Sequence, residues 1–540
     1  MKTKAILILV VLLSLTMCLC LSACNNLEPA PDPTDDNYRV FYQIFVGSFS
    51  DSNGDGVGDL RGIINRMDYL NDGNINSGKS LGVQGLWLSP IFESPSYHKY
   101  DATDYYSVDW EFGTEDDLKE LVELAHSRNV KVILDLAINH TSTQNEWFKE
   151  FKKARKPYKD HPDGDTDNPY YDFYTCVRGS ERVSGRTWYQ VPQCSDWYYE
   201  GNFDTGMPEL NFDNEAVRQE VVNVAKHYLD IGIDGFRFDA IKYIYYNDTA
   251  ETVEFWKWYM EQLKAIKPDI YTVGECWDPD STILQYYPAM NCFAFSAGTT
   301  ASGRIATAVR SQSMSAYTNY VVNLQSQILA ANPDGMFIPF IANHDNDRAA
   351  GYLDIPDGNA YMAANLLILT PGSPFIYYGE EIGMKGSRGG AQTDANRRLA
   401  MLWGDGDTIE DPIGATYNAD YQTNGTVSSH QKDKNSLLHH YEKLIGLRVK
   451  YPEIARGIYT AIGSFSQSGV GGFSVDYNGS KLAIIHNSSD EEVTVAMPLG
   501  FVAIGDYVGL NGARIVDGQL VIGAKTSVIL TFDIPQPTTK

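Results

Sequence analysis

Three acidic residues, Asp239, Glu275 and Asp345, each come at or just after the end of a short apolar run. In retaining glycoside hydrolysis, one carboxylate attacks the anomeric carbon and a second carboxyl protonates the leaving oxygen. Arg237 precedes Asp239 by two residues, so both side chains point the same way from a strand and the arginine can hold the acid ionised. Each acid alone would be read as a solvated loop residue or an ion-pair partner, but the set predicts cleavage of glycosidic bonds.

The elements that carry these acids are apolar runs that alternate with amphipathic stretches. Buried strands alternating with helices predict a parallel sheet, and this length and number of repeats favour an α/β (βα)8 TIM barrel over a doubly wound sheet. In such a barrel, reactive residues stand at the carboxyl ends of the strands. Strands are expected at residues 40–46, 83–88, 130–136, 234–238, 271–274, 336–342 and 373–379, with the weaker run 291–296 as the sixth. Helices are expected at 115–129, 215–232 and 436–451.

Two segments depart from this alternation. Residues 141–206 are rich in Tyr, Trp, Gly, Pro and Asp, so we expect a small inserted domain after the third strand, over the barrel mouth. Residues 453–540 alternate polar and apolar side chains, which predicts a C-terminal antiparallel β-sandwich. The barrel would then comprise residues 38–140 and 207–452.

The N-terminus has the pattern of an export signal. Residues 1–23 combine a charged start, a short apolar run and small residues before Cys24, and Leu-Ser-Ala-Cys resembles the bacterial lipobox. The alternative is an ordinary signal peptide with a chance cysteine. Residues 24–37 are polar and Pro-rich, as in a tether. We therefore expect a lipid on Cys24 to hold the protein at the bacterial membrane surface, facing outward.

The charge of the chain limits its partners. Its 540 residues include 43 Lys and Arg against 69 Asp and Glu, a formal net charge of −26. Nucleic-acid binding needs a basic stripe, so we expect no nucleic-acid partner. Aromatic residues make up 12% of the chain; they fill a core or line a sugar-binding surface.

The cysteines beyond the export signal show no spacing that suggests zinc. Cys176 and Cys194 flank a loop-rich segment and could pair in an exported protein. Cys276 and Cys292 lie in strand-like contexts and are expected to be buried thiols.

A candidate metal loop follows the first expected strand. Oxygen ligands at alternate positions around glycines suit Ca²⁺, although Gly62 stands where an EF-hand would carry its bidentate Glu. The alternative is a Gly- and Asp-rich turn without metal. The candidate ligands are Asp51, Asn53, Asp55, Val57 and Asp59.

Seven stretches together make the sequence resemble the α-amylase superfamily of glycoside hydrolases over nearly all of the chain after the signal. The lipobox, residues 97–109 and residues 400–405 look most like lipid-anchored surface α-amylases of gut bacteria. The seven stretches are GVQGLWLSP (82–90), DLAINH (135–140), MPELN (207–211), GFRFDAIKY (235–243), GECW (274–277), ANHD (342–345) and GSPFIYYGEEIG (372–383).

The resemblance implies the catalytic roles. Asp239 matches the nucleophile and Glu275 the acid/base, while Asp345 matches the acid that binds the sugar's 2- and 3-hydroxyls. Arg237 would orient Asp239. Lys242 matches a lysine of endo-acting α-amylases that contacts the leaving-group side.

The resemblance also implies the residues that hold the sugar at the cleavage position. Tyr100 matches the ring stacked under that sugar, and His140 and His344 match hydrogen-bond donors to it. Asp394 and Arg398 match a pair that holds the same sugar from its far side.

Some positions depart from the family pattern. Tyr243 replaces a His whose carbonyl often binds calcium, for which Asn139 and Glu209 match other ligands, so a second calcium site is left open. Glu209 itself stands where relatives mostly have Asp. Ala240 differs from the Val common in α-1,6-specific members. The resemblance assigns the Asp51–Asp59 loop to calcium.

The resulting expectation is an endo-acting α-amylase that hydrolyses α-1,4 bonds in starch and maltooligosaccharides. An α-glucosidase, a cyclomaltodextrinase or neopullulanase, or a transglycosylase of the same superfamily remains open. A non-catalytic starch-binding lipoprotein is disfavoured because all three carboxylates are retained.

Overall fold

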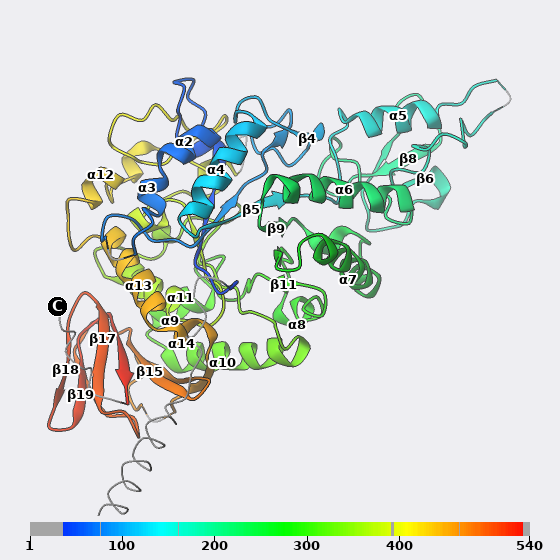
Figure 1. The fold of residues 1–540 in the computed structure, drawn as a ribbon. Helices are drawn as coiled ribbons and strands as arrows, with labels where there is room; N and C mark the ends of the chain where they lie inside the picture. Colours follow the sequence, from blue (N-terminus) through cyan, green and yellow to red (C-terminus); the bar gives the residue numbers. More distant parts are fainter. Residues whose placement is uncertain (1–35, 76, 160, 390–393, 464, 533–540) are drawn as a thin grey trace, which may run out of the picture. The chain divides into compact units, whose positions relative to one another are not determined.

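The computed structural model describes residues 36–75, 77–159, 161–389, 394–463 and 465–532 (Figure 1). The predicted signal and Cys24, with the tether up to residue 35, lie outside the described residues. Within the described ranges, no helix combines the length and the apolar character needed to cross a membrane.

A closed parallel barrel forms the centre of the fold and confirms the predicted fold class. Seven strands pair in the order β11-β10-β9-β5-β2-β1-β12. The seventh expected strand, residues 336–342, closes the ring through two isolated parallel bridges, Phe293 to Ile338 and Phe340 to Phe375. It forms no continuous ladder, because Pro339 at its centre has no N–H to donate. The regular strands are β1 (Phe41–Ile44), β2 (Gly85–Leu88), β5 (Lys131–Leu136), β9 (Gly235–Phe238), β10 (Tyr271–Gly274), β11 (Asn291–Cys292) and β12 (Phe375–Tyr377).

The helices between these strands begin and end at clear sequence signals. Thr114 and Asp117 form a capping box that starts α4, which buries its apolar face. Gly232 ends α6 in a left-handed conformation that glycine adopts without strain. All three expected helices are present, as α4, α6 and α13. The helices of the barrel are α2 (Leu60–Asn65), α3 (Met67–Leu70), α4 (Glu115–Ser127), α6 (Glu215–Ile231), α7 (Thr249–Ile266), α8 (Asp280–Ile283), α9 (Arg304–Ser311), α10 (Met314–Ala331), α11 (Asn359–Ile368), α12 (Val427–His430), α13 (Leu437–Lys450) and α14 (Pro452–Arg456).

Aromatic side chains fill the barrel interior. Phe41 stacks on Phe375 with ring centroids 4.8 Å apart and lies 4.5 Å from Tyr271. Phe293 lies 5.0 Å from Phe375 and 5.5 Å from Trp87. The interior is therefore a packed core, and polar groups must gather at the mouth above it.

The segment after β5 contains its own small sheet. Arg155 lies over the rings of Tyr171, at 3.8 Å, and Trp197, at 4.2 Å, and so ties the helix of this segment to its aromatic residues. Cys176 and Cys194 are both free thiols. The elements are α5 (Glu146–Arg155) and the antiparallel strands β6 (Cys176–Arg178), β8 (Trp197–Glu200) and β7 (Trp188–Gln190).

The C-terminal strands form two antiparallel sheets, as the alternation predicts. Ile485, Leu520 and Val528 belong to the apolar cluster shared by the two sheets. Asn365 of α11 donates to Ser527 Oγ at 2.9 Å, which ties this domain to the barrel. The sheets are β13 (Ile458–Ala461), β14 (Val470–Tyr477), β15 (Ser480–Asn487), β20 (Thr526–Thr531) and β17 (Ala503–Gly509), and β16 (Val493–Ala496), β19 (Gln519–Ile522) and β18 (Ala513–Val516).

Candidate active site

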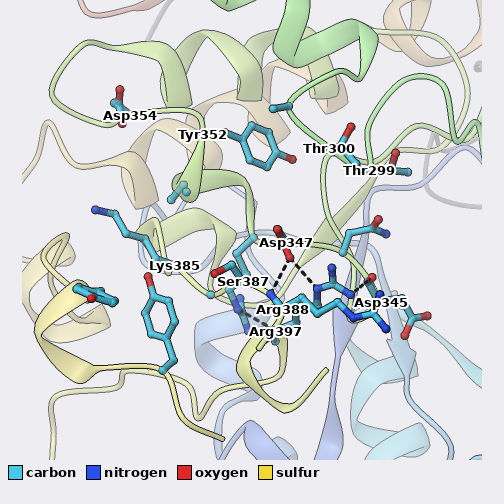
Figure 2. Close-up of a pocket in the computed structure, with 18 of the residues that line it drawn as sticks. Thr299, Thr300, Asp345, Asp347, Tyr352, Asp354, Lys385, Ser387, Arg388 and Arg397 are labelled. Atoms are coloured by element: carbon cyan, nitrogen blue, oxygen red, sulfur yellow. Dashed lines mark hydrogen bonds and ion pairs between the residues drawn. The ribbon is translucent and has the colours of Figure 1, made fainter. Parts of the chain in front are cut away.

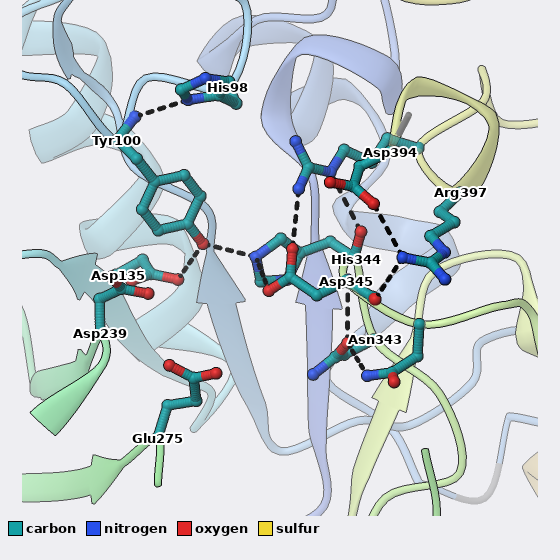
Figure 3. Close-up of polar contacts among 12 residues, drawn as sticks. His98, Tyr100, Asp135, Asp239, Glu275, Asn343, His344, Asp345, Asp394 and Arg397 are labelled. Atoms are coloured by element: carbon teal, nitrogen blue, oxygen red, sulfur yellow. Dashed lines mark hydrogen bonds and ion pairs between the residues drawn. The ribbon is translucent and has the colours of Figure 1, made fainter. Parts of the chain in front are cut away.

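The three predicted acids meet at one cavity of about 350 Å³ at the barrel mouth (Figure 3). Asp239 follows β9 directly and Glu275 follows β10, and the two strands are neighbours in the sheet. The predicted residues that line this cavity are Tyr100, His140, Asp239, Glu275, Asp345, Asp394 and Arg398. Arg237 and His344 are fully buried beneath it.

Arg237 is a buried cation shared by three acids. Its Nη1 donates to Asp135 Oδ1 at 2.8 Å and to Asp239 Oδ1 at 2.5 Å, and its Nη2 lies 3.5 Å from Glu275 Oε2. Asp135 also accepts hydrogen bonds from Trp87 Nε1 and from the Tyr100 hydroxyl. Asp135 was not among the predicted site residues, although an Asp inside the apolar run 130–136 is a visible signal.

The backbone after Asp239 donates two hydrogen bonds to Glu275. Ala240 has φ 44° and ψ 46°, a left-handed conformation that few residues other than glycine adopt. In this conformation its N–H donates to Glu275 Oε2 at 2.8 Å, and the next N–H, of Ile241, donates to the Glu275 carbonyl at 3.0 Å. The turn therefore fixes the position of the acid relative to the nucleophile candidate.

Glu275 has the protonation behaviour of a general acid. Burial raises its pKa from 4.5 to about 7, with Asp239 and Asp345 adding to the rise and Arg237 opposing it. Its side chain is 12% exposed, so a proton can still reach it. Near neutral pH, a substantial fraction of Glu275 carries the proton that a leaving oxygen needs.

Asp345 is held in the opposite state. Burial opposes its ionisation, but His344, Arg398 and Arg237 outweigh burial and lower its pKa to about 2. Arg398 Nη2 donates to Asp345 Oδ1 at 2.8 Å. Asp394, which is expected to hold the same sugar as Arg398, also lines the cavity and accepts a hydrogen bond from Arg397 at 2.8 Å.

His344 is a neutral imidazole. Burial lowers its pKa to about 3. Its Nδ1 lies 2.7 Å from Gln43 Nε2, and its Nε2 lies 2.6 Å from the Tyr100 hydroxyl and 3.0 Å from Asp345 Oδ2. The ring is nearly parallel to the Tyr100 ring, with centroids 5.6 Å apart, so His344 and Tyr100 orient each other.

The remaining predicted residues lie around this cluster. His140 Nε2 is 3.1 Å from the Tyr100 carbonyl, and its buried Nδ1 has no hydrogen-bond partner in the described part of the chain. Lys242 lies outside the cavity and donates to the Trp277 carbonyl at 3.1 Å and to Asp278 at 2.7 Å.

Several residues of the cavity were not predicted. His98, whose pKa burial lowers to about 4, accepts from the Tyr100 N–H. Phe203 extends from the segment after β5 to within 5.1 Å of the His140 ring. Tyr97, Asp204 and Met207 also line the cavity. These residues stand in loops, where no sequence period marks a shared face.

Two larger hollows each share a lining residue with the cavity. Asp345 lines both the cavity and a hollow of about 850 Å³ (Figure 2). Trp277 and Tyr421 contribute exposed rings to this hollow. Tyr97 lines both the cavity and a hollow of about 600 Å³. The catalytic cavity therefore has two larger hollows next to it.

The loop predicted to bind calcium is tightly hydrogen-bonded. Asp51 Oδ1 accepts from the N–H groups of Asn53 and Gly54, and Asn53 Nδ2 donates to Asp55 Oδ2 at 3.0 Å. Asp59 caps α2 through the Gly62 N–H. Among the described residues, no three His, Cys, Asp or Glu side chains group closely enough to hold a metal, so a cation here would also need Asn and backbone oxygens.

A second set of oxygens lies below the cavity. Asn139 Oδ1 and Glu209 Oε2 are buried and have no hydrogen-bond partner in the described residues. Burial raises the pKa of Glu209 well above its ordinary value. Orphaned buried acceptors are costly unless a cation or water satisfies them, so these two fit a cation site.

Comparison with known proteins gives consistent matches over most of the chain. The family model "Alpha amylase, catalytic domain" matches residues 43–457. The chain is 33% identical over 504 residues to "Alpha-amylase 3" of Dictyoglomus thermophilum, covering 91% of this chain and 92% of the relative. It is 30% identical to an "Oligo-1,6-glucosidase" of Bacillus cereus, covering 85% of this chain and 92% of that relative. The solved structure of Eubacterium rectale Amy13B superposes with a TM-score of 0.85 at 34% identity, covering 93% of this chain and 96% of that structure.

Proposed function

This chain belongs to the α-amylase family of glycoside hydrolases, and from that premise we propose that it is an endo-acting α-amylase that hydrolyses α-1,4-glucosidic bonds in starch and maltooligosaccharides. The observation that carries the endo-acting proposal is the presence of two larger hollows next to the catalytic cavity, one sharing Asp345 with it and the other sharing Tyr97. An enzyme that removes units from a chain end needs space for the polymer on one side only.

The proposed reaction follows the two protonation states of the site. Asp239, held by Arg237 at 2.5 Å, attacks the anomeric carbon and forms a covalent glycosyl-enzyme ester. Glu275 gives its proton to the departing oxygen, then takes one from the water that cleaves the ester. Asp345, whose pKa is about 2, remains ionised and can accept hydrogen bonds from the sugar hydroxyls. Configuration at the anomeric carbon is retained after two displacements.

The direction in which the glucan chain would lie in the cleft follows from the position of the acid. Glu275 must reach the glycosidic oxygen, so the leaving part of the chain lies on its side of the cavity. Lys242 and Trp277, which are joined by a hydrogen bond, belong to that side. The retained part of the chain then extends toward Tyr97.

Digestion of amylose and pullulan tests this proposal. Endo attack should reduce iodine staining while little glucose has formed, and pullulan should be a poor substrate. Early release of glucose would instead favour an α-glucosidase. Efficient cleavage of pullulan or cyclodextrins would favour a neopullulanase or cyclomaltodextrinase, and longer products made from maltotriose a transglycosylase.

We also propose that the enzyme binds Ca²⁺. Support comes from the alternating oxygens of Asp51, Asn53 and Asp55 and, at a second position, from the orphaned oxygens of Asn139 and Glu209. The carbonyl of Val57 and the carboxylate of Asp59 complete the first candidate set. The ion would screen these carboxylates and hold the loop, and no catalytic step requires it.

For location, we propose export and attachment to the outer surface of the bacterial membrane through a lipid on Cys24. The support is the sequence pattern of residues 1–24 alone. The predicted tether of residues 24–37 would leave the barrel free to meet a polymeric substrate.

A further inference from the structure

The hollow of about 600 Å³ beside Tyr97 has an unusual wall. Trp110, one of its lining residues, is 77% exposed. Within the described residues, the Trp110 ring contacts no other ring and its indole N–H has no hydrogen-bond partner. Ile413, also 75% exposed, lines the same hollow. Single exposed apolar residues need no explanation, but two that share one hollow next to a catalytic cavity mark a binding surface.

The segment that carries Trp110 is rigid. The buried Lys99 ammonium contacts the carboxylates on both sides of the tryptophan, Asp109 at 2.9 Å and Glu111 at 2.5 Å. Asp109 is fully buried and also accepts from the Ser94 N–H at 3.0 Å. The exposed ring is therefore presented by a fixed backbone, so little ordering entropy opposes ligand binding.

The polar groups of the hollow select the class of ligand. Glu111, Glu410 and Asp411 line it, apart from Asp55 of the proposed calcium loop, and its one lining cation, Lys99, is already bound to two carboxylates. This excess of negative charge disfavours phosphates and other anions. Carboxylate oxygens accept hydrogen bonds from hydroxyls, and an indole ring packs against an apolar face. A neutral sugar chain offers both.

The position of the hollow identifies which part of the chain it would meet. Arg398 bridges the two spaces, since it contacts Asp345 at 2.8 Å and the Tyr97 hydroxyl at 3.1 Å. Tyr97 lines both the cavity and the hollow, whereas Glu275 lines the cavity but not the hollow. The hollow therefore meets the cavity at Tyr97 and not at the acid, and Tyr97 is the residue toward which the retained part of the chain is proposed to extend.

We propose that this hollow binds the glucosyl units on the retained side of the cleaved bond, with Trp110 as the stacking platform at its outer edge. The inference rests on the proposed function, because it assumes an α-glucan in the catalytic cavity. It makes Trp110 a residue that determines preference for long substrates and takes no part in the chemistry.

The test measures binding and turnover of Trp110→Ala with long and short substrates. In the inactive Glu275→Gln background, titration calorimetry should show about fivefold weaker binding of maltoheptaose and less than a twofold change for maltose, the scale of one aromatic contact. With Glu275 intact, kcat/KM should fall by a similar factor on maltoheptaose and stay unchanged on maltose-length aryl substrates. Trp110→Phe should restore most of the loss. Tyr507→Ala, which removes a 41% exposed ring on the C-terminal domain, is the matched control.

The outcomes separate this inference from the proposed function. Equal losses on long and short substrates, or no loss on either, would overturn the role of Trp110 while starch hydrolysis by the wild type still stands. A wild-type protein that neither binds nor cleaves maltooligosaccharides would overturn the proposed function itself. Unchanged unfolding midpoints in the Trp110 variants would exclude misfolding as the cause of any loss.

Discussion

Replacing Glu275 with Gln should alter stability in a pH-dependent way, because the acid function has an energetic cost in the folded state. The pKa of Glu275 is about 7 in the folded protein and 4.5 ordinarily. Below pH 4.5 both states bind the proton. As the pH rises further, the unfolded chain releases it first, so the folded state loses about 1.4 kcal/mol per pH unit until pH 7. The accumulated penalty is about 3 kcal/mol, and Gln, which cannot ionise, removes it.

Urea unfolding at pH 4.5 and pH 8 measures this effect. Relative to wild type, Glu275→Gln should be more stable at pH 8 than at pH 4.5 by about 3 kcal/mol. Asp345→Asn is the matched control with opposite sign. The pKa of Asp345 is lowered from 3.8 to about 2, so its contribution is present above pH 3.8 and lost only as the pH falls toward 2. That variant should therefore be destabilised by about 2 kcal/mol at both pH values.

Kinetics provide the second measurement. Wild-type kcat should fall as pH rises through about 7, because the deprotonated acid cannot assist the leaving group. Glu275→Gln should lower turnover of starch by roughly 10²–10⁴-fold and lose that basic limb, with a smaller loss on aryl glycosides, whose leaving groups need little protonation. A stability difference that does not vary between pH 4.5 and 8, together with equal losses on both substrates, would refute the assignment of the acid.

Three further changes test the other proposals. Asp239→Asn should lose nearly all turnover but still bind maltooligosaccharides in calorimetry; a variant with substantial turnover would remove Asp239 from the nucleophile role. Chelation should lower the unfolding midpoint more than it slows the reaction. Calcium at 100 times its Kd would stabilise the folded protein by about 2.7 kcal/mol, which chelation removes. Asp55→Ala should remove most of this calcium-dependent stabilisation. A midpoint insensitive to chelator and to added calcium would contradict the metal loop. Cys24→Ser should move activity from the membrane fraction to the medium with unchanged specific activity; equal retention in the membrane pellet would contradict the lipid anchor.

The barrel was predictable because its signals are local. Most regular strands are short apolar runs, and Asp239 and Glu275 each follow such a run directly, which fixes them at the barrel mouth. The seventh strand illustrates the limit of that signal. Its apolar run was recognisable, but Pro339 leaves it with isolated bridges instead of a ladder.

Side-chain pairing was less predictable because it depends on backbone direction. Arg397 and Arg398 are adjacent in sequence, yet the first pairs with Asp394 and the second with Asp345. The short 3₁₀ turn Ala395–Arg397 sends the two guanidinium groups to different acids. Contributions from loops, such as Phe203, depend on how the segment after β5 folds back, and no periodic pattern records that.

The different environments of the Asp239 and Glu275 carboxyl groups also arise from tertiary structure. Both acids neighbour the same buried cation, but Arg237 donates a 2.5 Å hydrogen bond to Asp239 and lies 3.5 Å from Glu275. One guanidinium cannot fully neutralise Asp135, Asp239 and Glu275 together, and burial raises the pKa of both Asp135 and Glu275 to about 7. Of these two, only Glu275 lines the cavity, where its proton can reach a substrate. The left-handed Ala240 directs a backbone N–H to that carboxyl and thereby keeps it in position without a second cation. The same geometry therefore places Asp239 against the buried cation and Glu275 farther from it, which is the asymmetry that the proposed retaining mechanism requires.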